Sequence, residues 1–206
     1  MYKNVKVEED FDFFKHKQLI SFSLIIMGGL RGRIDTVFTL NYDSLLEWYL
    51  SIFGFKSNSI YKLPYKKVKC DVEVFHPHGY LPHTNYEKSN SSDKVILTRK
   101  QADRRLGDKN NPWFDTTLYH LSSKVFLFIG MSESTTTDRL LSSLFTTAHD
   151  RSKRTLGIWV FRRPIDKSVK QELNSSGIAP LILEGDDAIA NFILEICKKA
   201  SLLIKK

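Results

Sequence analysis

Short apolar segments alternate along this chain with longer segments whose apolar residues recur at helical spacing. The segments with strand character are 36–40, 67–75, 95–98, 125–129, 155–161 and 178–183. The segments with helical character are 11–27, 44–53, one that begins at 112, 137–149, 165–174 and one that begins near 186 or 187. Strands that alternate with helices form a mostly parallel sheet, because each crossover helix covers a face of that sheet. The pattern predicts an α/β fold, a Rossmann-like and mostly parallel sheet with helices on both faces.

Local signals set several of these boundaries. Gly28 and Gly29 are expected to end the first helix, because glycine is a poor helix former. Asn111 before Pro112 predicts a helix start, with an N-cap side chain and proline at the first helical position. Residues 67–75 alternate apolar and polar side chains, as a strand does.

The composition favours a single domain over residues 1–206, since 42% hydrophobic residues can form one core. No apolar run is long enough to span a membrane. Two cysteines are too few for a disulfide framework or a four-cysteine zinc site, which favours a reducing cytoplasm. The net charge of +8 is spread over several small groups. We interpret it first as solvated surface, next as attraction for an anionic small molecule or acidic partner, and least as nucleic-acid binding.

Polar and small residues follow three of the expected strands. They are Asn41 and Asp43 after the first, His76, His78 and Gly79 after the second, and Gly130, Ser132 and Asp138 after 125–129. Ligands of parallel α/β sheets bind beyond the carboxyl ends of the strands. Together these residues predict a polar crevice suited to a nucleotide.

Each group also has a simpler interpretation. Asn41 or Asp43 could cap the helix at 44–53. His76 and His78 have the separation of a metal-binding pair, but no carboxylate or cysteine stands at a defined spacing from them, so no metal site is predicted. Gly130 could serve an ordinary turn. Neither a Gly-x-Gly-x-x-Gly run nor a Walker phosphate loop occurs.

The order of these motifs resembles that of bacterial sirtuin-like domains. Residues 38–47, Phe-Thr-Leu-Asn-Tyr-Asp-Ser-Leu-Leu-Glu, are similar to the Thr-x-Asn-Tyr-Asp-x-Leu-x-Glu stretch of that family. His78-Gly79 is similar to its His-Gly motif, and 128–132 with Asp138 to its Gly-x-Ser and Asp-x-x-Leu segment. The resemblance runs from about residue 33 to the C-terminus. Members of this branch commonly hydrolyse NAD in antiviral defence.

The resemblance implies a role for each residue. Asn41 and His78 would be catalytic, with His78 as a general base or the partner of a ribose hydroxyl and Asn41 holding the attacking water or ribose. The residues expected to contact NAD are Thr39, Asp43, Gly79, Gly130, Ser132 and Asp138. NAD would be the substrate, and no metal would take part.

The chain departs from the family in two ways. The Gly-Ala-Gly-x-Ser phosphate loop and the strand before it are not recognisable, and Gly28-Gly29-Leu30-Arg31-Gly32 stands in the wrong place. The chain would then be a truncated form, a subunit completed by a partner or a second copy, or a degenerate relative. The zinc cysteines of protein-deacylating sirtuins are also missing, which argues against deacylation. The prediction is an NAD-cleaving subunit of a prokaryotic anti-phage complex; the alternative is a non-catalytic nucleotide-binding and scaffolding module.

Overall fold

The computed structural model describes residues 17–32, 34–82, 95–96, 98–131, 139–185 and 187–203. The strands are β1 (Thr36–Phe38), β2 (Ser57–Ile60), β3 (Val72–Phe75), β4 (Phe126–Phe128), β5 (Gly157–Phe161) and β6 (Ile178–Ile182). The helices are α2 (Lys17–Gly32), α3 (Leu45–Ile52), α4 (Arg99–Leu106), α5 (Pro112–Ser123), α7 (Arg139–Ser152), α8 (Lys167–Ser175) and α9 (Ala188–Leu203).

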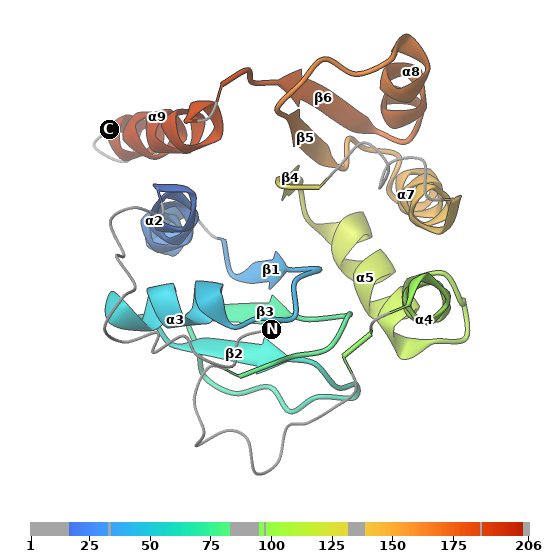
Figure 1. Ribbon diagram of the computed structural model, residues 1–206, viewed down its shortest axis with the longest axis horizontal. Helices are drawn as coiled ribbons and strands as arrows, with labels where there is room; N and C mark the ends of the chain where they lie inside the picture. The colour runs from blue at the N-terminus through green and yellow to red at the C-terminus, as the bar shows by residue number, and fades with distance from the viewer. Residues whose placement is uncertain are drawn as a thin grey trace.

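The strands form two three-stranded sheets with the orders β1-β3-β2 and β4-β5-β6. Every pair is parallel; Phe75 of β3, for example, is in register with Phe38 of β1 on one side and Ile60 of β2 on the other. Figure 1 shows the two sheets one above the other, with β1 and β4 as the strands that face each other. The parallel α/β fold predicted from the alternating pattern is confirmed.

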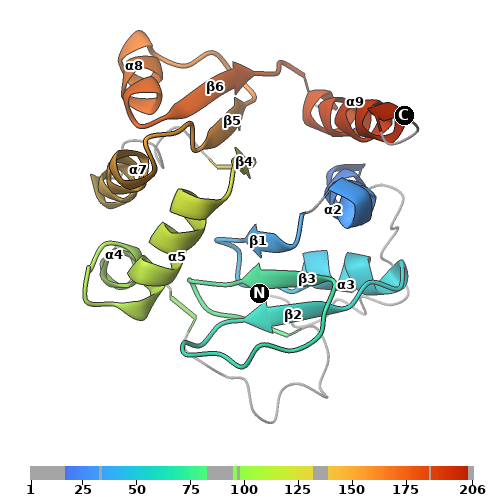
Figure 2. The same cartoon turned by 180° about the vertical axis from the view of Figure 1, so that it is seen from behind.

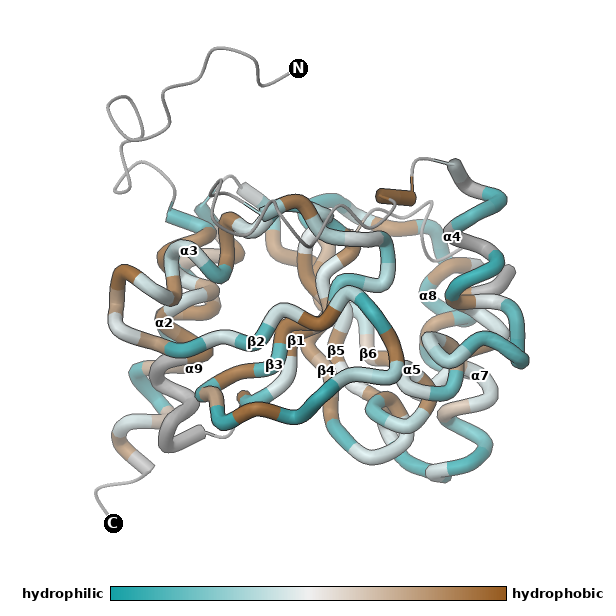
Figure 3. Tube along the Cα trace, turned by 90° about the horizontal axis from the view of Figure 1, so that it is seen from below, coloured by the Kyte–Doolittle hydropathy of each residue, from teal (hydrophilic) through white to brown (hydrophobic). Residues whose placement is uncertain are grey.

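Helices cover the sheets on both sides. Figures 1 and 2 place α2, α3 and α9 on one side and α4, α5, α7 and α8 on the other. Seen from below, the strands lie between these two groups, and much of the hydrophobic colour gathers there (Figure 3). This arrangement confirms the Rossmann-like layering. None of the helices that the structure describes is long and apolar enough to cross a membrane.

An aromatic cluster forms the core under the second sheet. Phe128, Trp159 and Phe161 stack on one another, with ring centroids 5.2 and 5.7 Å apart along this series. Phe145 of α7 meets Trp159 edge-on at 5.9 Å. Trp159 is fully buried. Alternate residues of parallel strands point to one face, so the Trp-Val-Phe sequence of β5 supplies two rings to this side.

The first helix does not end at the glycine pair, which corrects the expected boundary. Helix α2 continues through Gly28 and Gly29 to Gly32. Two glycines within a helix cost about 1 kcal/mol each relative to alanine. The packing of α2 against α9 and α3 offsets that cost.

Two elements are present that the hydrophobic pattern did not predict, and one expected strand is not formed. Strand β2 has the sequence Ser-Asn-Ser-Ile, and α4 is the charged segment Arg-Lys-Gln-Ala-Asp-Arg-Arg-Leu, so neither shows an apolar repeat. The expected strand at 95–98 is wrong where it is described, since Val95 and Ile96 belong to no strand. Instead the Ile96 N–H donates to the His78 carbonyl at 2.8 Å. The strand expected at 67–75 is shorter and begins at Val72.

Candidate functional site at the strand tips

The turn after β1 is held by its own side chains. The Thr39 N–H still pairs with the Phe75 carbonyl at 2.9 Å, while its hydroxyl accepts the Asn41 N–H at 3.1 Å. This short-range bond turns the chain directly after the strand. Asp43 then accepts the Leu45 N–H at 3.2 Å, at the first turn of α3. The N-cap position of α3 is Ser44, so neither Asn41 nor Asp43 caps this helix, and Asp43 instead closes the turn that leads into it.

Asn41 is left at the surface of this turn. Asn41 is exposed, and its side-chain amide has no hydrogen-bond partner among the described residues. Its backbone is fixed on both sides, through the N–H to Thr39 and through the carbonyl to His76. An immobile backbone with an unengaged amide is suited to holding a ligand.

The turn after β3 reverses tightly and needs glycine. The His76 N–H continues the ladder to the Ile60 carbonyl at 2.8 Å, and the Gly79 N–H returns to the His76 carbonyl at 3.1 Å. Gly79 is buried with φ of 99°, a region that side chains other than glycine rarely adopt. Gly79 therefore shapes the turn that positions His78.

Both histidines bind successive carbonyls of the turn after β1. His78 Nδ1 lies 3.2 Å from the Leu40 oxygen, and His76 Nδ1 lies 3.1 Å from the Asn41 oxygen. A carbonyl only accepts, so the Nδ1 of each ring carries a proton. These bonds join the two strand tips across 35 and 38 residues of sequence. The structure thereby brings the turn that carries Asn41 next to the turn that carries His78, and the convergence of the two side chains on one cleft stays a prediction.

A buried pair lies beneath this junction. His76 Nε2 is 2.6 Å from Glu47 Oε1, with the His76 side chain fully buried and that of Glu47 8% exposed. Ser59 donates its hydroxyl to the same Glu47 oxygen at 2.9 Å. The Tyr80 ring meets the His76 ring edge-on at 4.8 Å. His76 is thus engaged on both nitrogens and supports the turn from inside the fold.

His78 differs from His76 in its surroundings. It is only partly buried, and burial lowers its pKa below the usual value, as does the positive charge of Arg105. The hydrogen bond to Leu40 acts the other way but does not offset these effects. His78 is therefore neutral near pH 7. With the proton on Nδ1, its Nε2 carries a lone pair and can accept a proton.

Gly130 follows β4 on the neighbouring sheet. The Lys124 ammonium, just before β4, lies 2.5 Å from both Asp35 Oδ1 and Thr36 Oγ1, and Phe38 and Phe126 have ring centroids 6.1 Å apart. These contacts show that β1 and β4 run in the same direction, so both tips lie at the same end. Gly130 is exposed there with φ of 75°. Ser132 and Asp138 lie outside the described residues.

The described residues hold no group of three or more histidine, cysteine or acidic side chains that could bind a metal ion. His76 and His78 direct their Nδ1 atoms to backbone carbonyls instead. Two contributors had not been singled out from the sequence. Glu47 was only a motif position, and Arg105, which donates to the Pro77 carbonyl at 2.9 Å, was one cation in a basic segment. A charged residue on a strongly basic helix gives no signal of this kind of contact.

A comparison with known protein families matches the part of the chain that contains these turns. A family model for the SIR2-like domain matches residues 35–181, which is most of the chain and spans every described strand except the last residue of β6. A search of curated proteins found no match. The match begins just before β1 and includes the turns that carry Asn41, His78 and Gly130.

Proposed function

Because the chain belongs to the SIR2-like domain family, whose members use NAD, we propose that it cleaves NAD as a subunit of a prokaryotic anti-phage defence complex. The observation that carries the proposal is the state of His78. A neutral imidazole, whose Nε2 has no hydrogen-bond partner in the described part of the chain, lies on the turn that binds the Leu40 carbonyl next to exposed Asn41, at the carboxyl ends of parallel strands. Open α/β sheets bind their ligands at this end.

The reaction is hydrolysis of the bond between ribose C1′ and the nicotinamide nitrogen. Nicotinamide leaves as a neutral molecule, because its ring nitrogen is cationic in NAD, so the departure needs no proton. Water supplies the new C1′–O bond and gives one proton to His78 Nε2, leaving ADP-ribose. Asn41 holds the water or a ribose hydroxyl through its amide, which adds no charge. A positioned general base contributes about 10²–10⁴-fold in rate.

The other proposed ligand contacts fall into three groups. Thr39, Asp43 and Gly79 set the geometry of the turns through hydrogen bonds and backbone conformation. At Gly130, beyond the tip of β4, no atom of the described residues other than its chain neighbours lies within 4 Å of where a Cβ would stand. We include Ser132 and Asp138 in the site on family resemblance alone.

We further propose that a partner protein completes the site by adding a strand between the two sheets. Within the described residues β1 pairs only with β3, and β4 only with β5. All three residues of β1 are partly exposed, whereas three of the four residues of β3 are buried. β1 and β4 are each an edge strand of the sheet described for them, so a parallel strand added there would pair with both.

Nicotinamide release by the chain, alone and with the proteins encoded beside it, tests this function. We expect turnover with the partner present, and a drop of about 10²–10⁴-fold in both His78→Ala and Asn41→Ala at equal folded concentration. The control is Asn174→Ala, which removes an exposed asparagine of α8 and should leave turnover unchanged. Unchanged turnover in both site variants would refute the catalytic assignment.

The non-catalytic alternative has its own signature. It predicts NAD or a related nucleotide bound by the assembly, with no nicotinamide released under any combination of partners. The observation that favours it is the sequence itself, which contains no Gly-Ala-Gly run to hold a pyrophosphate. Binding that depends on Asn41 without turnover would establish this alternative.

A further inference from the structure

A cavity of about 370 Å³ opens beside the strand-tip turns, lined by residues that none of the proposed catalytic steps uses. It lies between the segment after β2 and the junction of α4 with α5. The residues that line it are Tyr61, Lys62, Leu63, Arg105, Asn111, Pro112 and Trp113. Its volume is within the range of small-molecule sites, about 300–1,000 Å³.

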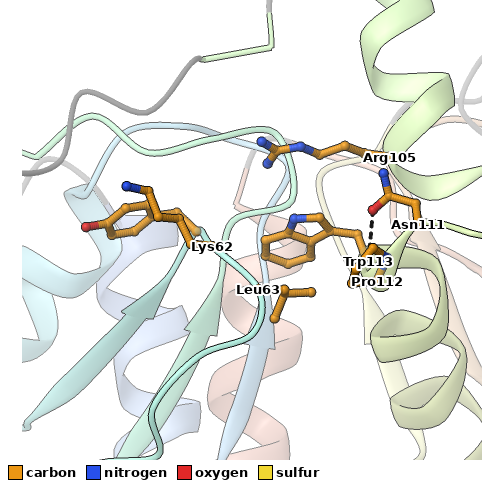
Figure 4. Close-up of a pocket in the computed structure, with 7 residues that line it drawn as sticks. Lys62, Leu63, Arg105, Asn111, Pro112 and Trp113 are labelled. Carbon is orange, nitrogen blue, oxygen red and sulfur yellow. Dashed lines mark hydrogen bonds between the residues drawn. The ribbon is translucent and has the colours of Figure 1, made fainter.

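The charge of this cavity is positive. Lys62 and Arg105 both line it, and no carboxylate does. The Lys62 ammonium lies 5.8 Å from the centre of the Tyr61 ring, and the Arg105 guanidinium lies 5.8 Å from that of Trp113. Figure 4 shows Lys62 across the hollow from Arg105, with Arg105 over one side of Trp113 and Leu63 on the other.

Arg105 has donors available for an anion. A guanidinium carries five N–H donors in a planar fork that matches a phosphate. Within the described part of the chain, its one hydrogen bond goes from Nη1 to the Pro77 carbonyl. Arg105 is partly buried, which lowers its pKa, so an anion bound to it would be less screened than one at the surface.

The remaining wall is apolar and aromatic. Leu63, Pro112 and the edge of Trp113 form it, together with the Tyr61 ring, which stacks on Tyr80 at 5.3 Å. A bare phosphate would fill only a small part of the volume and touch none of this surface. A ligand that carries both an anionic group and a ring would use the whole lining.

We propose that this cavity binds a nucleoside monophosphate, with its phosphate between Lys62 and Arg105 and its base against the wall of Leu63, Pro112 and Trp113. The site is separate from the proposed NAD site, since none of its lining residues belongs to the turns after β1 and β3. Arg105 connects the two through Pro77. A phosphate on Arg105 would reduce the effect of its charge on His78, so occupancy would raise the pKa of His78.

Calorimetry of the whole chain with AMP, adenosine and inorganic phosphate tests the proposal. We expect AMP to bind more tightly than either part, and Lys62→Glu to weaken AMP binding about tenfold or more, as loss of a charge-assisted contact does. The matched control is Lys170→Glu, which makes the same charge change at an exposed lysine of α8 and should leave binding unchanged.

Two further measurements locate the ligand. Asn41→Ala should not affect AMP binding, and AMP should move the NMR-detected pKa of His78 upward. AMP binding that is lost in Asn41→Ala but kept in Lys62→Glu would place the ligand at the strand tips and overturn the proposal. Phosphate binding as tightly as AMP, or no AMP binding at millimolar concentration, would also overturn it. These measurements need no NAD turnover, so a failure of AMP binding can be distinguished from a failure of the proposed NAD cleavage.

Discussion

Glu47→Leu should be among the most destabilising single changes in the first sheet. Glu47 lies on α3 and is buried, and its Oε1 accepts from both His76 Nε2 at 2.6 Å and Ser59 Oγ at 2.9 Å. Leucine has a similar volume, so the change leaves no large cavity. It leaves the fully buried His76 Nε2 without an acceptor, and the partly buried Ser59 hydroxyl loses its acceptor too.

The magnitude follows from that burial. Removing one partner of a buried ion pair costs about 3–5 kcal/mol, because the other charged or polar group stays desolvated. Replacing both partners with apolar residues of similar volume is often close to neutral. Glu47→Leu with His76→Phe should therefore cost less than Glu47→Leu alone, by at least about 1 kcal/mol. The Asn41 carbonyl loses its donor in the double variant, but Asn41 is exposed and water can replace the bond.

Urea unfolding of the two single variants and the double variant measures the coupling between these residues. Glu195→Leu is the control, since Glu195 forms an exposed pair with Lys198 at 3.9 Å and its loss should change the free energy of unfolding by no more than about 0.5 kcal/mol. If Glu47→Leu costs no more than this control, or if the two single costs simply add in the double variant, the pair does not stabilise the fold in the way described.

Three other changes test separate parts of the structure. The pKa of His120 is lowered to about 4, mainly by burial, so between pH 6.5 and 4 the unfolded chain binds a proton there that the folded chain does not. The free energy of unfolding should therefore decrease as the pH falls through this window. Thermal unfolding at each pH should show a smaller decrease for His120→Phe. Gly157→Ala should destabilise by more than about 2 kcal/mol, because its Cβ would lie 2.0 Å from the Phe126 carbonyl oxygen. A Cβ at Gly130 would meet no atom of the described residues beyond its chain neighbours, so Gly130→Ala should cost about 1–2 kcal/mol from its positive φ. Chemical unfolding compares the two variants. Asn111→Ala removes the side-chain oxygen that accepts the Trp113 N–H and should cost about 1 kcal/mol by urea unfolding.

The parts of the fold that could be predicted are those where hydrophobicity and local geometry agree. The apolar segments around 126–128 and 157–161 are strands, and Asn111 caps α5 as its sequence indicates. Strand β2 could not be recognised, because Ser-Asn-Ser-Ile lies at the edge of its sheet and three of its four residues are only partly buried. Tertiary packing also carried α2 through its glycines, which no local rule anticipates.

That the turns after β1 and β3 are neighbours was predictable from the sequence, whereas the hydrogen bonds between them were not. Parallel strands place their carboxyl ends together, so the turns after β1 and β3 had to be neighbours once the fold was known. The bonds from His76 and His78 to backbone carbonyls depend on the register of β1 against β3, which no sequence pattern specifies. The same is true of Arg105, whose contact with Pro77 comes from a helix that the apolar pattern did not reveal.

The two histidines of the His-Pro-His segment differ in burial and in how many ring nitrogens are hydrogen-bonded within the described residues. His76 is fully buried and has both ring nitrogens engaged, so it cannot exchange a proton with a ligand without breaking a contact of the fold. His78 is partly exposed and has one nitrogen engaged among the described residues, which leaves the other for a ligand. Changing His76 should therefore reduce activity by destabilising the turn that holds Asn41. Changing His78 should reduce activity by about 10²–10⁴-fold while removing only its hydrogen bond to Leu40, at a cost of about 1 kcal/mol in stability. That contrast, measured on the same preparations, would assign the chemistry to His78.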